Sequence, residues 1–241
     1  MPPADTTKKR RHYSGKTLYI GDEVGERGRE WFDVTVEPDG TRTLRAKCEI
    51  DGSVVHNFRV LRDVTFTLDG NCRPLDAFVR ITVNDKFMGS SWFRFGEHEV
   101  ECEGFTVNEG RISQKVPVAR WPRSFGSHPV VCDIWHLGGW DWKSKEKRQS
   151  WQAVMSSPLS SGASGPMIGL STFTADYVGE EKVTVKAGTF DTRHFVFPLH
   201  DRPQYDSPEH VWYAGDDLLF VKIRWDHLKT TYELVEYKEG A

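Results

Sequence analysis

Apolar and polar residues alternate with a period of two along much of the chain. Residues 43–50 place apolar side chains on one face and charged or hydroxyl side chains on the other, which is typical of a half-buried antiparallel strand. The same alternation occurs at residues 31–36, 64–68, 78–83, 91–95, 181–186, 189–197, 210–213, 218–225 and 230–237. Turn-forming pairs such as Asp51-Gly52 and Asn84-Asp85 separate several of these segments.

This arrangement predicts an all-β protein with an antiparallel, up-and-down topology. A long antiparallel series is best closed on itself, because closure removes exposed sheet edges. We therefore expect a lipocalin-like barrel or half-barrel of roughly eight to eleven strands, with one short helix between two strand series. Residues 1–12 are expected to be a disordered basic tail and residues 13–241 a single barrel domain. Residues 119–180 are interpreted as a helix and loop insertion at one end of the barrel.

The expected helix lies in the stretch 127–139. Ser127 is a good N-cap, Pro129 is tolerated in the first turn, and Gly138-Gly139 is a natural end. At about 100° per residue, one side of this helix is apolar. The opposite side carries four polar or reactive side chains: His128, Cys132, Asp133 and His136.

Two interpretations of this polar side remain open. It is either a solvent-exposed helix face or the support of a catalytic pair, in which Asp133 orients the imidazole of His136 from three residues away. We expect no metal site here, because His128 and His136 are separated by about 12 Å of helical rise and no companion ligand pair has metal-binding spacing.

Composition narrows the function classes. The net charge of −3 argues against a nucleic-acid-binding protein, and no run approaches the length of a membrane-spanning helix. The N-terminus shows no apolar signal segment, so a cytoplasmic location is expected. The four cysteines form no C-x-x-C pair and are expected to be buried free thiols. The aromatic content, with nine Trp, fourteen Phe and seven Tyr, suits a pocket for a flat apolar ligand as well as a large core.

Histidines reappear in the second half of the chain, around the polar segment 200–209. This segment is either an ordinary connection or the mouth of the barrel, where a histidine acts as general base and Tyr or Arg holds a developing oxyanion. Lys222 and Arg224 share one face of the following strand. They would bind an anion if that face looks into the barrel and are surface charges otherwise.

Residues 183–190 and 210–224 carry a resemblance to a known family. Val185 to Phe190 reads V-x-A-G-x-F, residues 212–216 read W-Y-A-x-D, and residues 221–223 read V-K-I. In these segments the chain resembles an uncharacterised bacterial family of lipocalin-like β-barrel proteins, a domain of unknown function whose members are usually periplasmic. The resemblance extends in layout over residues 13–241 and implies the barrel fold, but it implies no catalytic residues. The chain departs from the family in lacking a signal segment and in its additional Trp and His residues.

Two functions of different classes follow from these observations. The first is a cofactor-independent enzyme of lyase or isomerase type, which acts by histidine acid–base chemistry on an apolar small molecule, for example an aromatic or phenolic one. The second is a non-catalytic protein that binds or carries a hydrophobic small molecule. A homodimer is compatible with either function. The candidate catalytic residues are His136, Asp133, His194, His200 and His210, and the candidate substrate-binding residues are Trp135, Tyr205, Trp212, Lys222 and Arg224.

Overall fold

The alternating segments of the sequence form strands of one continuous sheet. The computed structural model describes residues 9–51, 58–159, 162–199 and 205–240. Within them the strands are β1 (Arg11–Gly21), β2 (Gly25–Val36), β3 (Arg42–Ile50), β4 (Val60–Leu68), β5 (Pro74–Val83), β6 (Lys86–Phe95), β7 (Glu99–Thr106), β8 (Gly110–Pro117), β9 (Ser124–Gly126), β10 (Arg148–Met155), β11 (Gly169–Val185), β12 (Gly188–Phe197), β13 (Glu209–Ala214), β14 (Leu219–Trp225) and β15 (Thr230–Gly240). The helical segments are α1 (Val130–Ile134), η1 (Trp135–Gly139) and η2 (Asp226–Leu228), the last two of 3-10 type.

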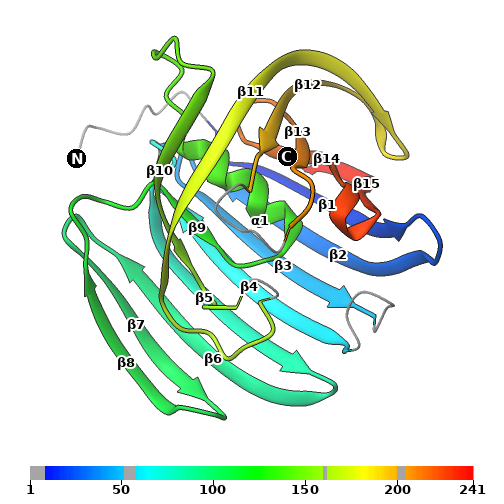
Figure 1. Cartoon of the computed structure of the whole chain (residues 1–241). Coiled ribbons are helices and arrows are strands. Elements are labelled where there is room, and N and C mark those ends of the chain that lie inside the picture. Colours follow the sequence, from blue (N-terminus) through cyan, green and yellow to red (C-terminus); the bar gives the residue numbers. More distant parts are fainter. Residues whose placement is uncertain (1–8, 52–57, 160–161, 200–204, 241) are drawn as a thin grey trace.

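The sheet is built from two meanders that meet at the chain's first and last strands. Its order is β8-β7-β6-β5-β4-β3-β2-β1-β15-β14-β13-β12-β11-β10-β9. Neighbouring strands are antiparallel except for β9 and β10, which are parallel. Strands β8 and β9 are the two edges, so the sheet is strongly curved but not closed over the described residues (Figure 1). The all-β prediction with one short α-helix is therefore confirmed, whereas a closed barrel does not form.

Three sequence-based expectations need correction. The sheet has fifteen strands within the described residues, not eight to eleven. Segment 119–180 is not a helix and loop insertion, because it contains β9, β10 and most of β11. Strand β9 escaped the pattern because it has only three residues. The end of β11 lies in the predicted segment 181–186, but its first part, residues 169–180, escaped because half-exposed and exposed Ser, Thr and Glu residues blur the alternation. The expected tail of residues 1–12 overlaps a strand at its end, because β1 begins at Arg11, and residues 1–8 lie outside the described residues.

The turn between β5 and β6 shows how local chemistry sets the register. Asn84 and Asp85 both have positive φ, at 49° and 62°. Two successive left-handed residues match the right-handed twist of a two-residue hairpin, and Asn and Asp tolerate this conformation better than most residues. The turn predicted at these two residues is thus confirmed.

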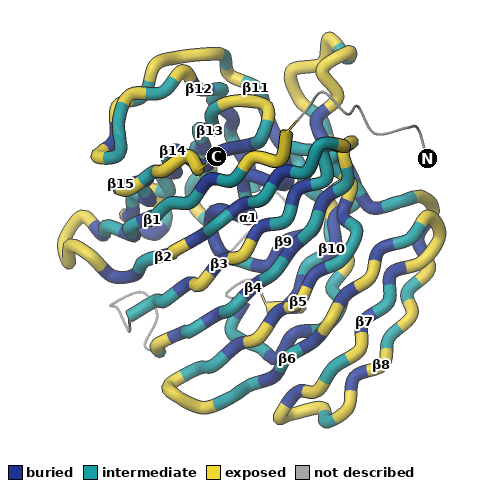
Figure 2. Tube along the Cα trace, turned by 180° about the vertical axis from the view of Figure 1, so that it is seen from behind, coloured by how far each residue is buried: buried dark blue, intermediate teal, exposed yellow. Residues whose placement is uncertain are grey.

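The core lies on the concave side of the sheet. Figure 2 shows the opposite, convex side, where buried and more exposed residues alternate along the strands. On the concave side, Phe125 of β9 packs its ring at 5.1 to 5.3 Å from the rings of Phe66, Phe93 and Phe95. Trp135 packs against Phe66 at 5.4 Å and is therefore a core residue.

No helix among the described residues is long and apolar enough to cross a membrane.

Most of α1 and η1 is buried within the curve of the sheet, which overturns the interpretation of a solvent-exposed polar helix face. Figure 1 shows α1 inside this curve. Cys132 is 0% exposed and His136 only 2% exposed, while His128 and Asp133 are half-buried. A helix on the outer surface has one solvated side, whereas none of these four residues is exposed.

Candidate functional site

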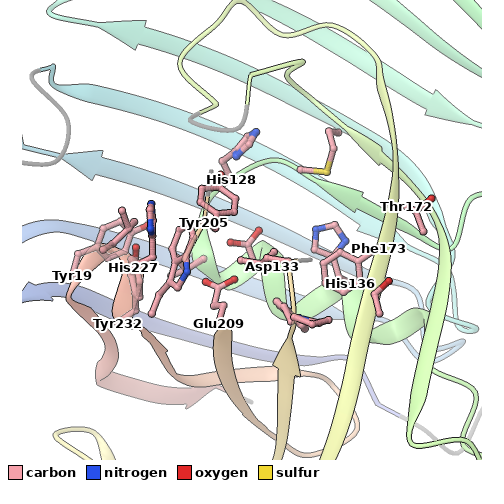
Figure 3. Close-up of a pocket in the computed structure, with 18 of the residues that line it drawn as sticks. Tyr19, His128, Asp133, His136, Thr172, Phe173, Tyr205, Glu209, His227 and Tyr232 are labelled. Carbon is pink, nitrogen blue, oxygen red and sulfur yellow. The ribbon is translucent and has the colours of Figure 1, made fainter. Parts of the chain in front are cut away.

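A cavity of about 630 Å³ opens on the concave side of the sheet, next to α1. Strands from both meanders and the helix contribute to its walls. The residues that line it include Tyr19, Arg27, Arg62, His128, Asp133, His136, Arg148, Phe173, Phe197, Tyr205, Glu209, Trp225, His227 and Tyr232. The cavity thus combines aromatic rings with several titratable and charged side chains (Figure 3).

Helix α1 is held in place by Glu30 of β2. The carboxylate of Glu30 accepts hydrogen bonds from the backbone N–H groups of Val130 (2.6 Å) and Val131 (3.2 Å). The hydroxyl of Tyr19 donates to the same carboxylate. The prediction that Ser127 caps the helix is wrong, because the N-cap residue is Pro129 and no side-chain cap hydrogen bond forms there. A carboxylate from a distant strand satisfies these otherwise unpaired N–H groups instead.

Burial changes the acidity of Glu30. The side chain is 0% exposed, and this loss of solvation raises its pKa from 4.5 to about 7. The hydrogen bonds from Tyr19, Val131 and Val130 oppose the rise but do not overcome it. Glu30 therefore changes its charge near neutral pH, directly behind the helix that borders the cavity.

Two helix residues bring acid–base groups to the cavity. Asp133 of α1 and His136 of η1 both line it, one turn apart. The imidazole of His136 stacks on the ring of Phe173 with centroids 4.2 Å apart and planes inclined by 15°. Figure 3 shows Asp133 near the centre of the site, with Glu209 extending from β13 on one side and His136 on another. The predicted Asp–His pair is thus part of a wider group of acid–base side chains.

A buried arginine occupies the Tyr19 side of the cavity. Arg27 is 4% exposed and donates to the hydroxyl oxygens of Thr230 (3.0 Å) and Tyr232 (2.9 Å). Its guanidinium also lies 5.8 and 5.6 Å from the ring centroids of Tyr19 and Tyr232. Burial raises the pKa of Tyr232 far above its ordinary value. Since Arg27 donates to Tyr232, the phenolic proton of Tyr232 is left to donate elsewhere.

A cluster of three rings forms a further wall. Tyr205 packs edge-on against Trp225 at 4.8 Å and against His227 at 5.1 Å. His227 is held by Asp206, whose carboxylate oxygen lies 2.8 Å from the Nδ1 atom. Tyr205 was predicted to bind substrate, and the structure places it in the cavity wall.

Five of the predicted site residues lie on the other side of the sheet. His194, His210, Trp212, Lys222 and Arg224 alternate along β12 to β14 with fully buried residues such as Phe195, Val211 and Ile223, so they point away from the core. The sequence could not say which strand face was inward. None of the five lines the cavity, and Trp135 is in the core. His200 lies outside the described residues.

Four of these outward residues form a cluster of their own, while Arg224 pairs with Asp22 and Asp226. The Nε2 atom of His194 is 3.0 Å from the Nδ1 atom of His210. The Nδ1 atom of His194 is 3.1 Å from the Glu181 carboxylate. The His194 imidazole stacks on Trp212 with centroids 4.3 Å apart. Lys222 lies over the same indole at 5.5 Å. The predicted single site is therefore divided between the two faces of the sheet.

Sequence reasoning missed Glu30, Arg27 and Arg62, although a signal for two of them exists. Glu30 belongs to the same alternating series in β2 as Phe32, Val34 and Val36, which all face the core. Arg62 likewise faces the same side of β4 as the buried residues Val60, Val64, Phe66 and Leu68. A charged residue at an inward position of a strand is rare in a core and marks a site or a buried pair.

Comparisons with known proteins support the fold alone. No family model matches the chain, and no curated protein is detectably similar in sequence. Among solved structures, the chain is similar to a β-barrel-like protein of the domain of unknown function DUF1849 from Brucella abortus. The TM-score is 0.56 and the identity 11%, over 96% of this chain and 98% of that one. The resemblance to an uncharacterised barrel-like family is consistent with this likeness.

Proposed function

We propose that the concave cavity binds a small organic molecule with an aromatic or apolar body, and that the protein acts on this molecule by acid–base chemistry without a cofactor. The observation that carries the proposal is the presence of three imidazoles and two carboxylates in the wall of one cavity of about 630 Å³: His128, Asp133, His136, Glu209 and His227. This volume falls within the usual range of small-molecule sites.

The apolar part of the wall supports the choice of ligand body. Phe173, Phe197, Tyr205 and Trp225 offer ring faces and edges to the cavity. Such rings stack on a flat ligand, and the low dielectric of a space lined by apolar groups strengthens the interaction between charged groups within it. An aromatic or phenolic compound therefore fits the wall better than a sugar or a small polar metabolite.

The polar part of the wall supports proton transfer. An imidazole such as that of His136 removes a proton from a carbon or hydroxyl group of the ligand, and a neighbouring carboxylate such as Asp133 stabilises the imidazolium that forms. The Tyr232 hydroxyl, which receives a hydrogen bond from Arg27, donates its own proton in a hydrogen bond to the resulting oxyanion. Return of the proton to another ligand atom gives an isomerase, and departure of a leaving group gives a lyase.

The test combines a compound panel with single replacements. The protein is incubated with phenolic, terpenoid and fatty compounds, and mass spectrometry follows both depletion and new masses. His136→Gln and Asp133→Asn are expected to lower turnover of the responding compound by about 100-fold or more while leaving its binding in place. His210→Gln is the matched control, since His210 lies on the outer face. Full turnover in the variants of all five cavity residues would refute the catalytic proposal.

A non-catalytic carrier is the second candidate, and the ring cluster of Tyr205, Trp225 and His227 favours it. A wall of mutually packed rings binds an apolar ligand without any proton transfer. A carrier enriches a compound from the same panel at unchanged mass and quenches tryptophan fluorescence reversibly. It is also indifferent to the His136→Gln replacement, which separates it from the enzyme.

A further inference from the structure

Arg62 is a buried cation in the middle of the concave face. It lies on β4, directly between Cys48 of β3 and Ile81 of β5, and is 1% exposed. Its Nη2 atom donates a hydrogen bond of 3.0 Å to the carbonyl oxygen of Gly162. Among the described residues, no carboxylate forms an ion pair with it. The guanidinium nevertheless lines the cavity.

This environment is unfavourable for an arginine in the absence of a ligand. A buried charge is usually paired, because a neutral acceptor compensates only part of the lost hydration. The planar guanidinium carries five N–H donors, and one carbonyl oxygen occupies a single one of them. Its fork matches the two oxygens of a carboxylate in a bidentate arrangement.

His128 and Gly162 complete the surroundings of Arg62. Gly162 has φ of +65°, and a Cβ atom placed on it would lie 2.5 Å from Cγ of His128 and 2.8 Å from Nη2 of Arg62. The glycine backbone therefore approaches both side chains closely. His128 lines the cavity as well, so its imidazole and the guanidinium border the same part of the space.

Asp133 and Glu209 line the same cavity, with Asp133 near its centre (Figure 3). Among the described residues, no ion pair or hydrogen bond joins either carboxylate to Arg62. Glu30 lies two strands from Arg62, with Cys48 between them, and its oxygens are engaged by Tyr19 and α1. Among the described residues, the guanidinium of Arg62 therefore has a neutral acceptor, the carbonyl of Gly162, and no carboxylate partner.

We infer that Arg62, together with His128, forms a subsite for a carboxylate, so that the ligand of the cavity is an aromatic or apolar carboxylic acid. This inference rests on the proposed function, because it assigns the charged group of the molecule that the cavity binds. The acid group binds in the fork of Arg62, and its apolar body extends toward the rings of Phe173 and Trp225.

The experiment compares two probes that differ only in charge, 2-naphthoate and 2-naphthamide. Their affinities are measured by isothermal titration calorimetry on the full chain at neutral pH. The wild type is expected to bind the acid at least ten-fold more tightly than the amide. Arg62→Met abolishes this preference and leaves the affinity for the amide within about two-fold. Arg45→Met is the control, because Arg45 forms an exposed ion pair with Asp33, and it leaves the preference intact.

Each outcome decides a separate question. Equal binding of the two probes by the wild type, or a preference for the acid that survives in Arg62→Met, overturns the carboxylate subsite while the cavity proposal stands. Binding of neither probe removes the cavity proposal, and the subsite falls with it. Circular dichroism checks that Arg62→Met is folded. If it is not, Arg62→Lys serves instead, and it is expected to reduce the acid preference because a single ammonium cannot bind both oxygens in the same way. An unchanged preference in that variant counts against the subsite.

Discussion

The buried carboxylate of Glu30 gives a direct test of how the fold holds α1. Replacing it by glutamine keeps the size of the side chain and the oxygen that accepts from Tyr19 and Val130, but an amide nitrogen takes the place of the oxygen that accepts from Val131. The variant therefore loses the ability to ionise and, at every pH, the longer of the two bonds to the helix. Because Glu30 is fully buried, the pH dependence of the difference from the wild type isolates the effect of placing a negative charge behind the helix.

The magnitude follows from the pKa of Glu30. Burial raises it from 4.5 to about 7, so the folded protein holds this proton more tightly than the unfolded chain does. The stabilising contribution of the protonated group is complete below pH 4.5, declines as the pH rises through 7, and is constant above that. At about 1.4 kcal/mol for each pKa unit, the wild type loses about 3 kcal/mol of unfolding free energy from this group. Glu30→Gln, which stays neutral, does not lose it.

The assay is urea unfolding followed by tryptophan fluorescence at pH 4.5, 5.5, 6.5 and 7.5. The unfolding free energy of Glu30→Gln minus that of the wild type should rise by about 3 kcal/mol across this range. Taking the difference removes the contribution of histidines that titrate in both proteins. Glu49→Gln is the control and shows no such rise, because the hydrogen bond from Lys47 lowers the pKa of Glu49. A difference that stays constant from pH 4.5 to 7.5 would refute the reasoning.

Three further outcomes are expected. Phe125→Ala should lower the unfolding free energy by about 3 to 5 kcal/mol in urea titrations, because the Phe125 ring fills the space among three other phenylalanines. Phe105 is half-exposed, so Phe105→Ala serves as the control. A loss below about 1 kcal/mol, or one no larger than that of the control, would contradict this packing. Gly162→Ala should weaken binding of 2-naphthoate at least ten-fold in calorimetry, because the added methyl group crowds His128 and Arg62; unchanged affinity would show that these groups are not part of the site. Burial and, to a smaller extent, repulsion from His210 lower the pKa of His194. The unfolded chain therefore binds this proton more tightly than the folded protein does. The stability that neutral His194 provides is complete above its ordinary pKa of 6.5 and is lost as the pH falls through the lowered pKa. His194→Gln should therefore lose less melting temperature than the wild type between pH 7 and 5, and an equal loss in thermal melts would count against this account.

The fold could be predicted to a large extent because its signals are local. Alternation over four to nine residues identified most of the strands, and Asn84-Asp85 identified a hairpin turn. The same local signals failed at β9, which is very short, and in the first part of β11, where the alternation is weak. Closure of the sheet is not a local property, and the sequence pattern is the same for an open and a closed meander.

The candidate site was predictable only in part. Asp133, His136 and Tyr205 line the cavity as the sequence suggested. His194 and His210 do not, because a period of two separates the faces of a strand without saying which one is covered.

Local patterns in the sequence are enough to specify an all-β chain with a short helical interruption, since backbone preference and side-chain periodicity act between near neighbours. Two contacts became visible with the folded arrangement alone: Glu30, a strand residue, holds the start of a helix 100 positions later in the chain, and Arg62 is buried beside Gly162. These contacts depend on how far the sheet curves and which of its faces the helix covers. Curvature and coverage are settled by the packing of the whole core, and no segment of the chain carries that information alone.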